Sequence, residues 1–288
     1  MVIGLAGVAF VVRTLVSRWD EVTAAFDDVR PAALLGSLAL GLCAMSLIGW
    51  TWTSMIRTRG HDHHRRALAM SWYFTGQLGK YVPGGIWPIV GRAEMAARSG
   101  VPRPDAYAST GLSLVTTYLG ATIAVAIGSL VSGQRREVGA VVAAGLVAAY
   151  IMFSNTRLRA RILSLVGRIA ANVQSLTDPR RLARLAVVHV PAWILMSLST
   201  SVTAAAFGAR IGLFDMLFVA SASWLAGFVV VGVPGGIGVR EAVFTSLAGG
   251  IVGVPVAVSL ALVSRVVFIA VDLLGALGAN VAARVTDH

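Results

Sequence analysis

Charged residues are scarce in this chain of 288 residues. Asp, Glu, Lys and Arg together make up 13% of it, about half of the share found in ordinary soluble domains. Hydrophobic residues reach 57%, and the mean hydropathy is +0.79. A soluble globule of this size could not bury that much apolar surface, and disordered chains require low hydrophobicity. The composition therefore predicts an all-α, polytopic membrane protein.

Cysteine and the motifs of soluble catalysis are almost absent. The single cysteine, Cys43, excludes an intrachain disulfide and any metal site built from several Cys ligands. We find no P-loop, nucleophile elbow, His-Glu-x-x-His or dinucleotide fingerprint. The His61-Asp-His-His64 cluster lies in a short basic loop without further Cys or acidic ligands, so we interpret it as a solvated loop. We expect no enzymatic activity, no metal and no cofactor.

Acidic residues are outnumbered, since 13 Asp and Glu stand against 24 Lys and Arg, for a net charge of +11. In a soluble protein this excess would suggest nucleic acid, but no basic stretch with interleaved aromatic residues is present. Cytoplasmic loops of membrane proteins collect Arg and Lys. Segment 57–66 has four Arg and one Asp, and segment 155–184 has seven Arg and one Asp. We expect both segments in the cytoplasm, and no nucleic-acid partner.

Long apolar runs account for most of the chain. A helix needs roughly 20 residues to cross a bilayer. Six runs are of suitable length, at 1–16, 32–56, 104–131, 138–154, 185–207 and 255–280. Two further apolar stretches, 67–99 and 214–252, are interrupted by Pro-Gly-Gly at 83–85 and 234–236. Proline removes a helix donor and glycine is a poor helix former, so we expect two half-helices in each stretch.

The orientation depends on these two broken stretches. If each is a re-entrant hairpin that returns to its side of entry, both termini lie in the cytoplasm; if each crosses fully, the middle of the chain is reversed. Arg98 and Arg103 favour the re-entrant version. Residues 155–176 combine an apolar stripe at helical spacing with off-stripe arginines, which predicts a basic helix on the inner leaflet of the cell membrane. The alternative is a solvent-facing connector helix.

The chain also repeats itself. Lys80-Tyr-Val-Pro-Gly-Gly-Ile86 matches Val231-Gly-Val-Pro-Gly-Gly-Ile237, and Gly100-Val-Pro102 matches Gly253-Val-Pro255. Within one membrane domain, 1–288, this predicts two repeats, 32–131 and 185–280, joined by the linker 155–184. Because the first begins outside and the second inside, they would be inverted, as in secondary transporters. A duplication without transport is the alternative.

Seven charged residues lie within or beside the apolar stretches. They are Lys80, Arg92, Glu94, Arg240, Glu241, Arg265 and Asp272. A charge at the centre of a membrane helix costs about 2.5–3.5 kcal/mol on insertion scales, so it needs a partner or a wet cavity. We take all of these except Asp272 as candidate substrate-binding residues.

The prolines and glycines of the two breaks complete the candidate site. They are Pro83, Gly84, Gly85, Pro234, Gly235, Gly236 and Gly238. Arg240 follows the second break, where free amides at the start of a new half-helix favour an anion and a guanidinium suits phosphate. Lys80 and Arg92 flank the first break in the same manner. The pattern predicts a lipid-phosphate site reachable from both leaflets.

Structural interpretations of the same residues stay open. Arg240 and Glu241 could form ion pairs with charges of the other half, and Lys80 could extend to the interface. Arg265 and Asp272 lie seven residues apart, share one face of the last span, and are better suited to pairing across the bundle than to binding substrate. Six aromatic residues are better interpreted as belts at the membrane interfaces than as a binding site. They are Trp50, Trp52, Trp72, Tyr73, Tyr81 and Trp87.

The second break and its surroundings resemble the lysylphosphatidylglycerol synthase transmembrane-region family. The resemblance rests on Pro234-Gly-Gly-Ile-Gly-Val-Arg-Glu-Ala242, Gly253-Val-Pro255 and Ser264-Arg265, and on Gly79-Lys-Tyr-Val-Pro-Gly-Gly-Ile-Trp87 with Gly91-Arg92. It covers about residues 30 to 280. This family includes the flippase half of the multiple peptide resistance factor, and stand-alone members suspected of handling polyprenyl-linked lipids.

The resemblance implies a functional core, formed by Gly235, Gly236, Arg240 and Glu241 and by Pro83, Gly84, Gly85 and Arg92. Two features depart from the family pattern. No soluble aminoacyl-transferase domain is present, so we expect no lipid synthesis. Many members have Glu-Arg in the span after the first motif, where this chain has Thr116-Thr-Tyr118.

Together these observations predict translocation of an anionic lipid or a polyprenyl-phosphate-linked envelope intermediate between leaflets. Arg240 and Arg92 would hold the phosphate, and Glu241 and Glu94 would pair with them when the site is empty. One alternative is a non-catalytic membrane partner that docks a glycosyltransferase or another envelope-lipid enzyme on segment 155–184. A second is an enzyme that acts on a lipid headgroup, for which we find no nucleophile.

Overall fold

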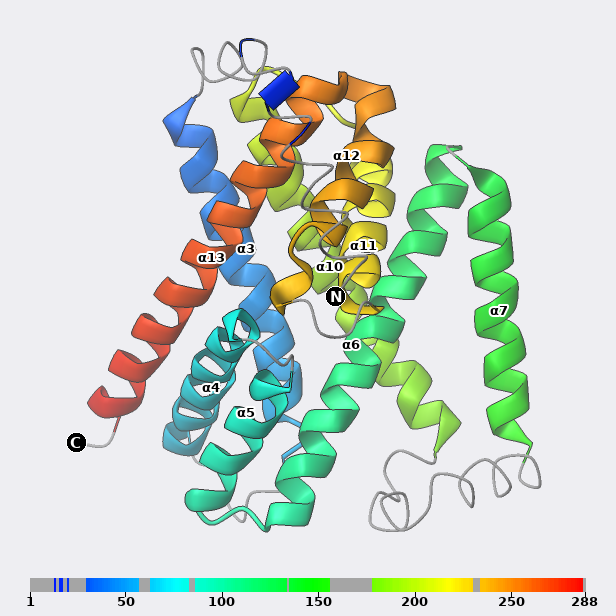
Figure 1. The fold of residues 1–288 in the computed structure, drawn as a ribbon. Coiled ribbons are helices and arrows are strands. Elements are labelled where there is room, and N and C mark those ends of the chain that lie inside the picture. Colours follow the sequence, from blue (N-terminus) through cyan, green and yellow to red (C-terminus); the bar gives the residue numbers. More distant parts are fainter. Residues whose placement is uncertain are drawn as a thin grey trace.

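A computed structural model describes residues 13, 16, 17, 20, 30–56, 63–82, 86–133, 135–155, 178–229 and 234–286. All regular structure within these residues is helical. The elements are α3 (Pro31–Thr53), α4 (His63–Gln77), η1 (Leu78–Tyr81), α5 (Trp87–Arg98), α6 (Arg103–Ser132), α7 (Arg136–Ser154), α10 (Pro179–Ala206), α11 (Leu213–Val229), η3 (Pro234–Gly236), α12 (Val239–Val252) and α13 (Val254–Val285). Figure 1 shows them as one bundle of inclined helices.

Five described helices are long and apolar enough to cross a membrane. They are α3, α6, α7, α10 and α13. These confirm the spans predicted at 32–56, 104–131, 138–154, 185–207 and 255–280, so the protein is an all-helical, multi-pass membrane protein. Almost all of the predicted span 1–16, and residues 156–177 of the predicted interfacial helix and linker, lie outside the described residues.

Two predicted boundaries need correction. The linker was predicted to extend to residue 184, but α10 begins at Pro179, with the Asp178 side chain accepting a hydrogen bond from the Arg180 amide at 3.0 Å. A carboxylate at this position caps the free amides, so the helix starts before its apolar part. Similarly, α4 begins at His63, so the second half of the cluster interpreted as a solvated loop is helical.

Each of the two broken stretches forms a pair of short helices, as predicted. α4 packs against α5, and α11 packs against α12. In Figure 1 the first pair leads into α6 at the lower end of the bundle, and the second leads into α13 at the upper end. The second break contains three residues with positive φ, Gly235, Gly236 and Gly238, at 57°, 67° and 81°. Side chains rarely tolerate this conformation, which explains the glycines.

Helix packing follows a reciprocal pattern between a first unit (α3, α4, η1, α5, α6) and a second unit (α10, α11, η3, α12, α13). α6 packs against α5 of its own unit and against α10 and α11 of the other. α13 packs against α12 of its own unit and against α3 and α4 of the other. α3 packs against α10, and η1 contacts η3. The last helix of each unit therefore packs on the first two helices of the other unit.

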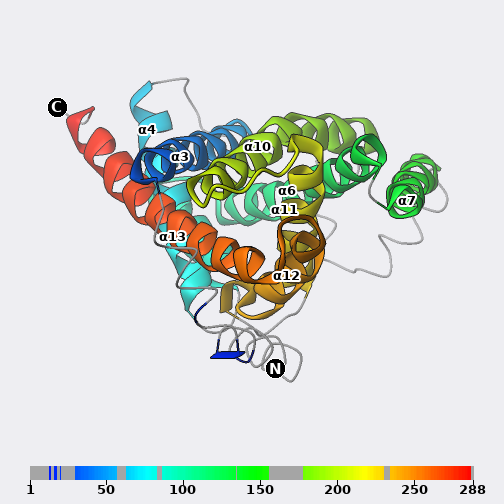
Figure 2. The ribbon, with the colours of Figure 1, turned by 90° about the horizontal axis from the view of Figure 1, so that it is seen from above.

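The central α3–α10 contact is polar and closely packed. The Ser37 hydroxyl lies 2.8 Å from the Ser199 carbonyl oxygen and 2.7 Å from the Thr203 hydroxyl, and the Ser199 hydroxyl donates to the Ser37 carbonyl at 2.8 Å. Small polar residues of this kind let membrane helices approach and bond to each other. α7, by contrast, packs mainly on α6 and lies at the side of the bundle in Figure 2.

Candidate functional site

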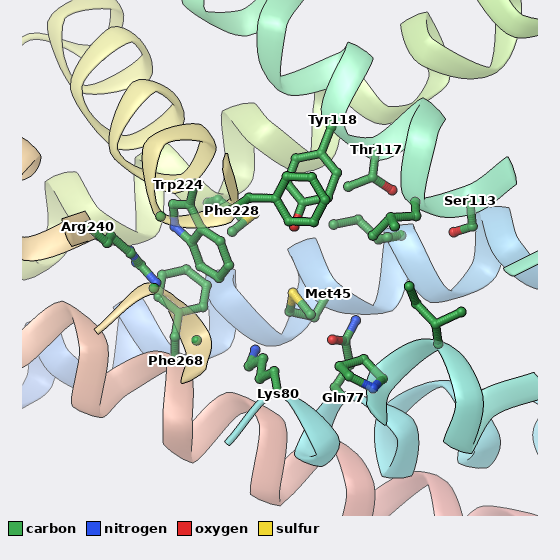
Figure 3. Close-up of a pocket in the computed structure, with 18 of the residues that line it drawn as sticks. Met45, Gln77, Lys80, Ser113, Thr117, Tyr118, Trp224, Phe228, Arg240 and Phe268 are labelled. Atoms are coloured by element: carbon green, nitrogen blue, oxygen red, sulfur yellow. The ribbon is translucent and has the colours of Figure 1, made fainter. Parts of the chain in front are cut away.

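A cavity of about 380 Å³ lies between the two units. Every element of both units contributes to its wall, and α7 does not. Its volume is within the usual range for small-molecule sites and suits a headgroup rather than a whole lipid. The charged residues that line it are Lys80, Arg92, Arg240 and Arg265. Figure 3 shows the cavity with Arg240 and Trp224 at one end and Ser113 at the other.

The short helices η1 and η3, which lie beside the two breaks, contact each other at this cavity. A Cβ atom built on Gly235 would lie 3.6 Å from the Lys80 carbonyl oxygen and 3.1 Å from Nη2 of Arg265. Arg265 also donates from Nη2 to the Gly235 carbonyl at 3.4 Å. The break in the second unit therefore touches the end of η1 in the first, and the missing Cβ atom leaves room for the arginine.

Arg240 occupies the first turn of α12, as expected for a residue that follows the break. Its guanidinium carbon lies 3.8 Å from the centroid of the Trp224 ring and 5.7 Å from that of Phe268. The side chain rests against Gly227 of α11, where an added Cβ would lie 3.2 Å from Cβ of Arg240. Among the described residues no carboxylate lies within 4 Å of this guanidinium, so aromatic faces are its principal neighbours.

Arg92 has a similar environment in the first unit. It is 7% exposed, and its guanidinium carbon lies 4.6 Å from the centroid of the Tyr73 ring and 5.0 Å from that of Trp52. Its Nε atom is buried without a hydrogen-bond partner within the described part of the chain, where no carboxylate pairs with it either. A Cβ on Gly76 would lie 3.1 Å from Cβ of Arg92. Gly76 and Gly227 each lie seven residues before the proline of their break.

The other two cations do have acidic partners. Lys80 Nζ lies 2.6 Å from Oδ2 of Asp272, and the Tyr81 hydroxyl donates to the same oxygen. Arg265 forms an ion pair with Oε1 of Glu241, whose Oε2 accepts a hydrogen bond from the Gly238 amide at 2.6 Å. Asp272 therefore pairs across the two units, whereas Arg265 pairs with a carboxylate of the neighbouring helix in its own unit.

The predicted pairing of Glu241 and Glu94 with Arg240 and Arg92 is wrong for this structure. Glu241 forms its ion pair with Arg265 and accepts the hydrogen bond of the Gly238 amide at the start of α12. The amides at this helix start were expected to be free to bind an external anion. Neighbouring helix positions point in different directions, so Glu241 turns away from Arg240.

Glu94 lies away from the cavity. Its side chain is 26% exposed and accepts hydrogen bonds from Arg103 at 3.1 Å and from the Tyr107 hydroxyl at 3.0 Å. Arg92 and Glu94 are two positions apart on α5, and such residues face opposite sides of a helix. The carboxylate therefore joins α5 to the start of α6 instead of reaching the cavity.

Six of the 13 predicted site residues line the cavity. They are Lys80, Arg92, Gly235, Gly236, Arg240 and Arg265. Glu241 and Gly238 support this set from outside the cavity wall, whereas Glu94 is separate. Pro83, Gly84 and Gly85 lie outside the described residues, and Pro234 begins η3.

Sequence reasoning missed the aromatic part of the site. Trp52 and Tyr73, assigned to interfacial belts, are fully buried beneath Arg92, and Tyr81 binds Asp272. Trp50 and Trp87 are exposed, as a belt residue would be. Trp224 and Phe268 were not singled out at all. The sequence did contain a signal for these aromatic residues. Neither Arg92 nor Arg240 has an acidic residue three or four positions away on its helix. An arginine in an apolar segment without such a partner can be stabilised by aromatic faces.

Comparison with protein families gives a match over most of the chain. The family described as lysylphosphatidylglycerol synthase TM region matches residues 1–275. This range includes Lys80, Arg92, Arg240 and Arg265, and both breaks. A comparison with curated protein sequences found no match.

Proposed function

The chain belongs to the lysylphosphatidylglycerol synthase transmembrane-region family, and we propose that it moves an anionic lipid between the two leaflets of the cell membrane. The lipid is a phospholipid or a polyprenyl-phosphate-linked envelope intermediate. One observation carries this proposal: Arg92 and Arg240 line a cavity between the two units, and neither has an acidic partner among the described residues. As a carrier, the protein needs no covalent step and no catalytic residue.

Electrostatics favour an anionic ligand. A charge at the centre of a membrane helix costs about 2.5–3.5 kcal/mol, and an aromatic face returns roughly 0.5–2 kcal/mol of that. Within the described part of the chain, neither guanidinium forms an ion pair, and the nearby acids Glu241 and Asp272 are paired with Arg265 and Lys80, so the site keeps an excess of positive charge. A lipid phosphate would supply the missing negative charge, and its oxygens match the planar donors of arginine.

The shape of the cavity supports a lipid with its headgroup inside and its chains outside. Ile86, Phe228 and Val229 line the cavity and are also exposed on the surface of the bundle. They come from the start of α5 and the end of α11, so the cavity opens between the two units. At this opening the Tyr118 and Phe228 rings stack at 3.7 Å between centroids (Figure 3). Acyl or prenyl chains would leave the cavity here and remain in the hydrocarbon region.

The reciprocal helix packing supports an alternating-access mechanism. We take the first and second units as inverted repeats, 32–131 and 185–280, with α4–α5 and α11–α12 as re-entrant hairpins. The helix ends next to the basic segments 57–66 and 155–184 lie at the same lower end of the bundle in Figure 1, which we assign to the cytoplasm. Rocking one unit against the other would then expose the cavity to each leaflet in turn.

Native mass spectrometry of the gently solubilised protein tests this proposal, together with a leaflet-exchange assay in liposomes. We expect a co-purified phospholipid or polyprenyl phosphate that is lost in Arg240→Ala and Arg92→Ala, and slower exchange of that lipid in both variants. Arg103→Ala is the matched control, because Arg103 is exposed and outside the cavity. Normal exchange by a well-folded Arg240→Ala protein would contradict the proposal, as would equal lipid loss in the control.

The docking alternative makes a different prediction. It rests on segment 155–184, most of which lies outside the described residues. None of the described residues of this segment lines the cavity, so the cavity gives the docking alternative no support. Removal of the arginines of that segment would abolish complex formation with a membrane enzyme and leave lipid binding intact.

A further inference from the structure

We propose that Asp272 takes up a proton when the anionic lipid binds, so that the protein carries lipid and proton together. This inference rests on the proposed lipid transport and adds its coupling ion. It comes from a difference between two buried carboxylates, Asp272 and Glu241, which are 0% and 4% exposed.

Glu241 has a direct partner for each of its two carboxylate oxygens. One of its oxygens is paired with Arg265, and the other accepts the Gly238 amide at 2.6 Å. A backbone amide cannot move away, and Arg265 is itself held by the Gly235 carbonyl. Both oxygens of Glu241 therefore have partners, and one of these partners is a backbone amide that cannot turn toward another anion.

Asp272 depends on one movable cation. Both of its partners, Lys80 and Tyr81, reach the same oxygen, Oδ2. Its Oδ1 atom is buried and has no hydrogen-bond partner within the described part of the chain. Among the described residues, Lys80 is thus the one cation that pairs directly with Asp272, with a single hydroxyl in support.

Lys80 is shared between Asp272 and the cavity. It lines the cavity, whereas Asp272 does not. Its Nζ atom lies 5.7 Å from the centroid of Trp224, the ring on which Arg240 rests at 3.8 Å. Figure 3 shows the ends of Lys80 and Arg240 directed toward the space around Trp224 and Phe268. A phosphate bound by Arg240 therefore competes for Lys80, whose flexible stem lets its ammonium turn toward the new anion.

Protonation of Asp272 follows when the Lys80 ammonium moves toward the bound phosphate. Without Lys80, the carboxylate would keep only the Tyr81 hydroxyl, and an unpaired buried carboxylate strongly favours its neutral form. A hydronium ion from the medium then gives its proton to Oδ1: one O–H bond of the hydronium breaks, an O–H bond forms on Asp272, a water molecule is left, and no bond in the lipid breaks. The cycle takes up one proton with each lipid anion and releases it when Lys80 returns.

The other groups around Asp272 do not replace Lys80. On α4 the nearby titratable group is Tyr73, which is uncharged, and on α12 it is Arg240, which rests on Trp224 and faces the cavity. Arg265, on the same helix, is paired with Glu241. α3 contains no charged residue, and the arginines of α10 lie in its first two turns.

Proton uptake during lipid binding tests the inference directly. The purified protein, in detergent and weak buffer with a pH indicator, is titrated with short-chain phosphatidylglycerol, whose phosphodiester does not itself titrate near neutral pH. We expect the wild type to take up as much as one proton per bound lipid. Its affinity should rise as pH falls, by as much as about tenfold per pH unit, because one proton is linked to binding. Asp272→Asn should bind lipid without proton uptake, with an affinity independent of pH.

Two further variants keep the test decisive. Glu137→Gln removes an exposed carboxylate of α7, outside the cavity, and its proton uptake per bound lipid should match that of the wild type. The double variant Lys80→Met/Asp272→Asn removes both charges, so it serves if Asp272→Asn does not fold, and it should show no uptake. Binding without uptake in the wild type, or uptake that persists without Asp272, overturns the coupling and leaves lipid transport standing. Absence of Arg240-dependent binding overturns both.

Discussion

The ammonium group of Lys80 lies 2.6 Å from a carboxylate oxygen of Asp272, and this ion pair joins the tip of the first hairpin to the last helix of the second unit. It is a contact between the two units, beside a cavity that both units line. A movement that separates η1 from α13 would break this pair. The same contact therefore contributes to stability and to the proposed transport cycle.

Single and double substitutions of this pair should not be additive. Lys80→Met leaves a buried carboxylate without its cation, and breaking a buried pair in this way costs about 3–5 kcal/mol. Lys80→Met/Asp272→Asn removes both charges and should recover most of that loss. Thermal unfolding in detergent measures both effects. A double variant as unstable as Lys80→Met would show that the pair contributes little beyond packing.

Gly275 should be essential for the contact between α13 and α4. A Cβ atom at this position would lie 2.3 Å from the ring of Phe74, which is itself buried. We expect Gly275→Ala to destabilise the protein by about 1–3 kcal/mol, since overpacking forces a ring or a helix to shift. Gly278→Ala, on the same helix, is the control, because nothing lies within 4 Å of its Cβ position. Similar unfolding temperatures for the two variants would contradict the close approach.

Trp224 should contribute to lipid affinity through its contact with Arg240. Its ring holds the Arg240 guanidinium at 3.8 Å, and such contacts contribute roughly 0.5–2 kcal/mol. Trp224→Leu should therefore weaken lipid binding by roughly 2- to 30-fold. Trp50→Leu is the matched control, because Trp50 is exposed and contacts Arg66 outside the cavity. Lipid titration followed by mass spectrometry compares them, and equal affinities would remove Trp224 from the site.

Gly227 should be needed to position Arg240. A Cβ atom here would lie 3.2 Å from Cβ of Arg240 and 3.4 Å from Cα of Gly236, so a larger side chain would displace the arginine. We expect Gly227→Val to lower lipid affinity by about tenfold, the loss that a displacement worth about 1.4 kcal/mol would produce. Gly91→Val on α5 is a control at a position with no neighbour within 4 Å. A Gly227→Val protein with unchanged affinity would show that Arg240 tolerates the displacement.

The amino-acid sequence by itself determined where the chain enters lipid and where its helices break. A run of apolar residues long enough to cross a bilayer becomes a helix whatever surrounds it, because the backbone must satisfy its own hydrogen bonds. The five confirmed spans follow from this rule. The break before α12 is equally local, since Gly235, Gly236 and Gly238 adopt positive φ angles that other residues avoid.

Only the tertiary structure decided which charges meet. Arg240 and Glu241 are adjacent in the chain, yet Glu241 binds Arg265 and Arg240 rests on Trp224. Asp272 finds its cation on a hairpin of the other unit. Burial in lipid obliges each charge to find a partner, but the choice of partner depends on helix crossing and rotation. Helix crossing and rotation arise from the packing of distant surfaces, such as Gly275 against Phe74, which no local pattern encodes.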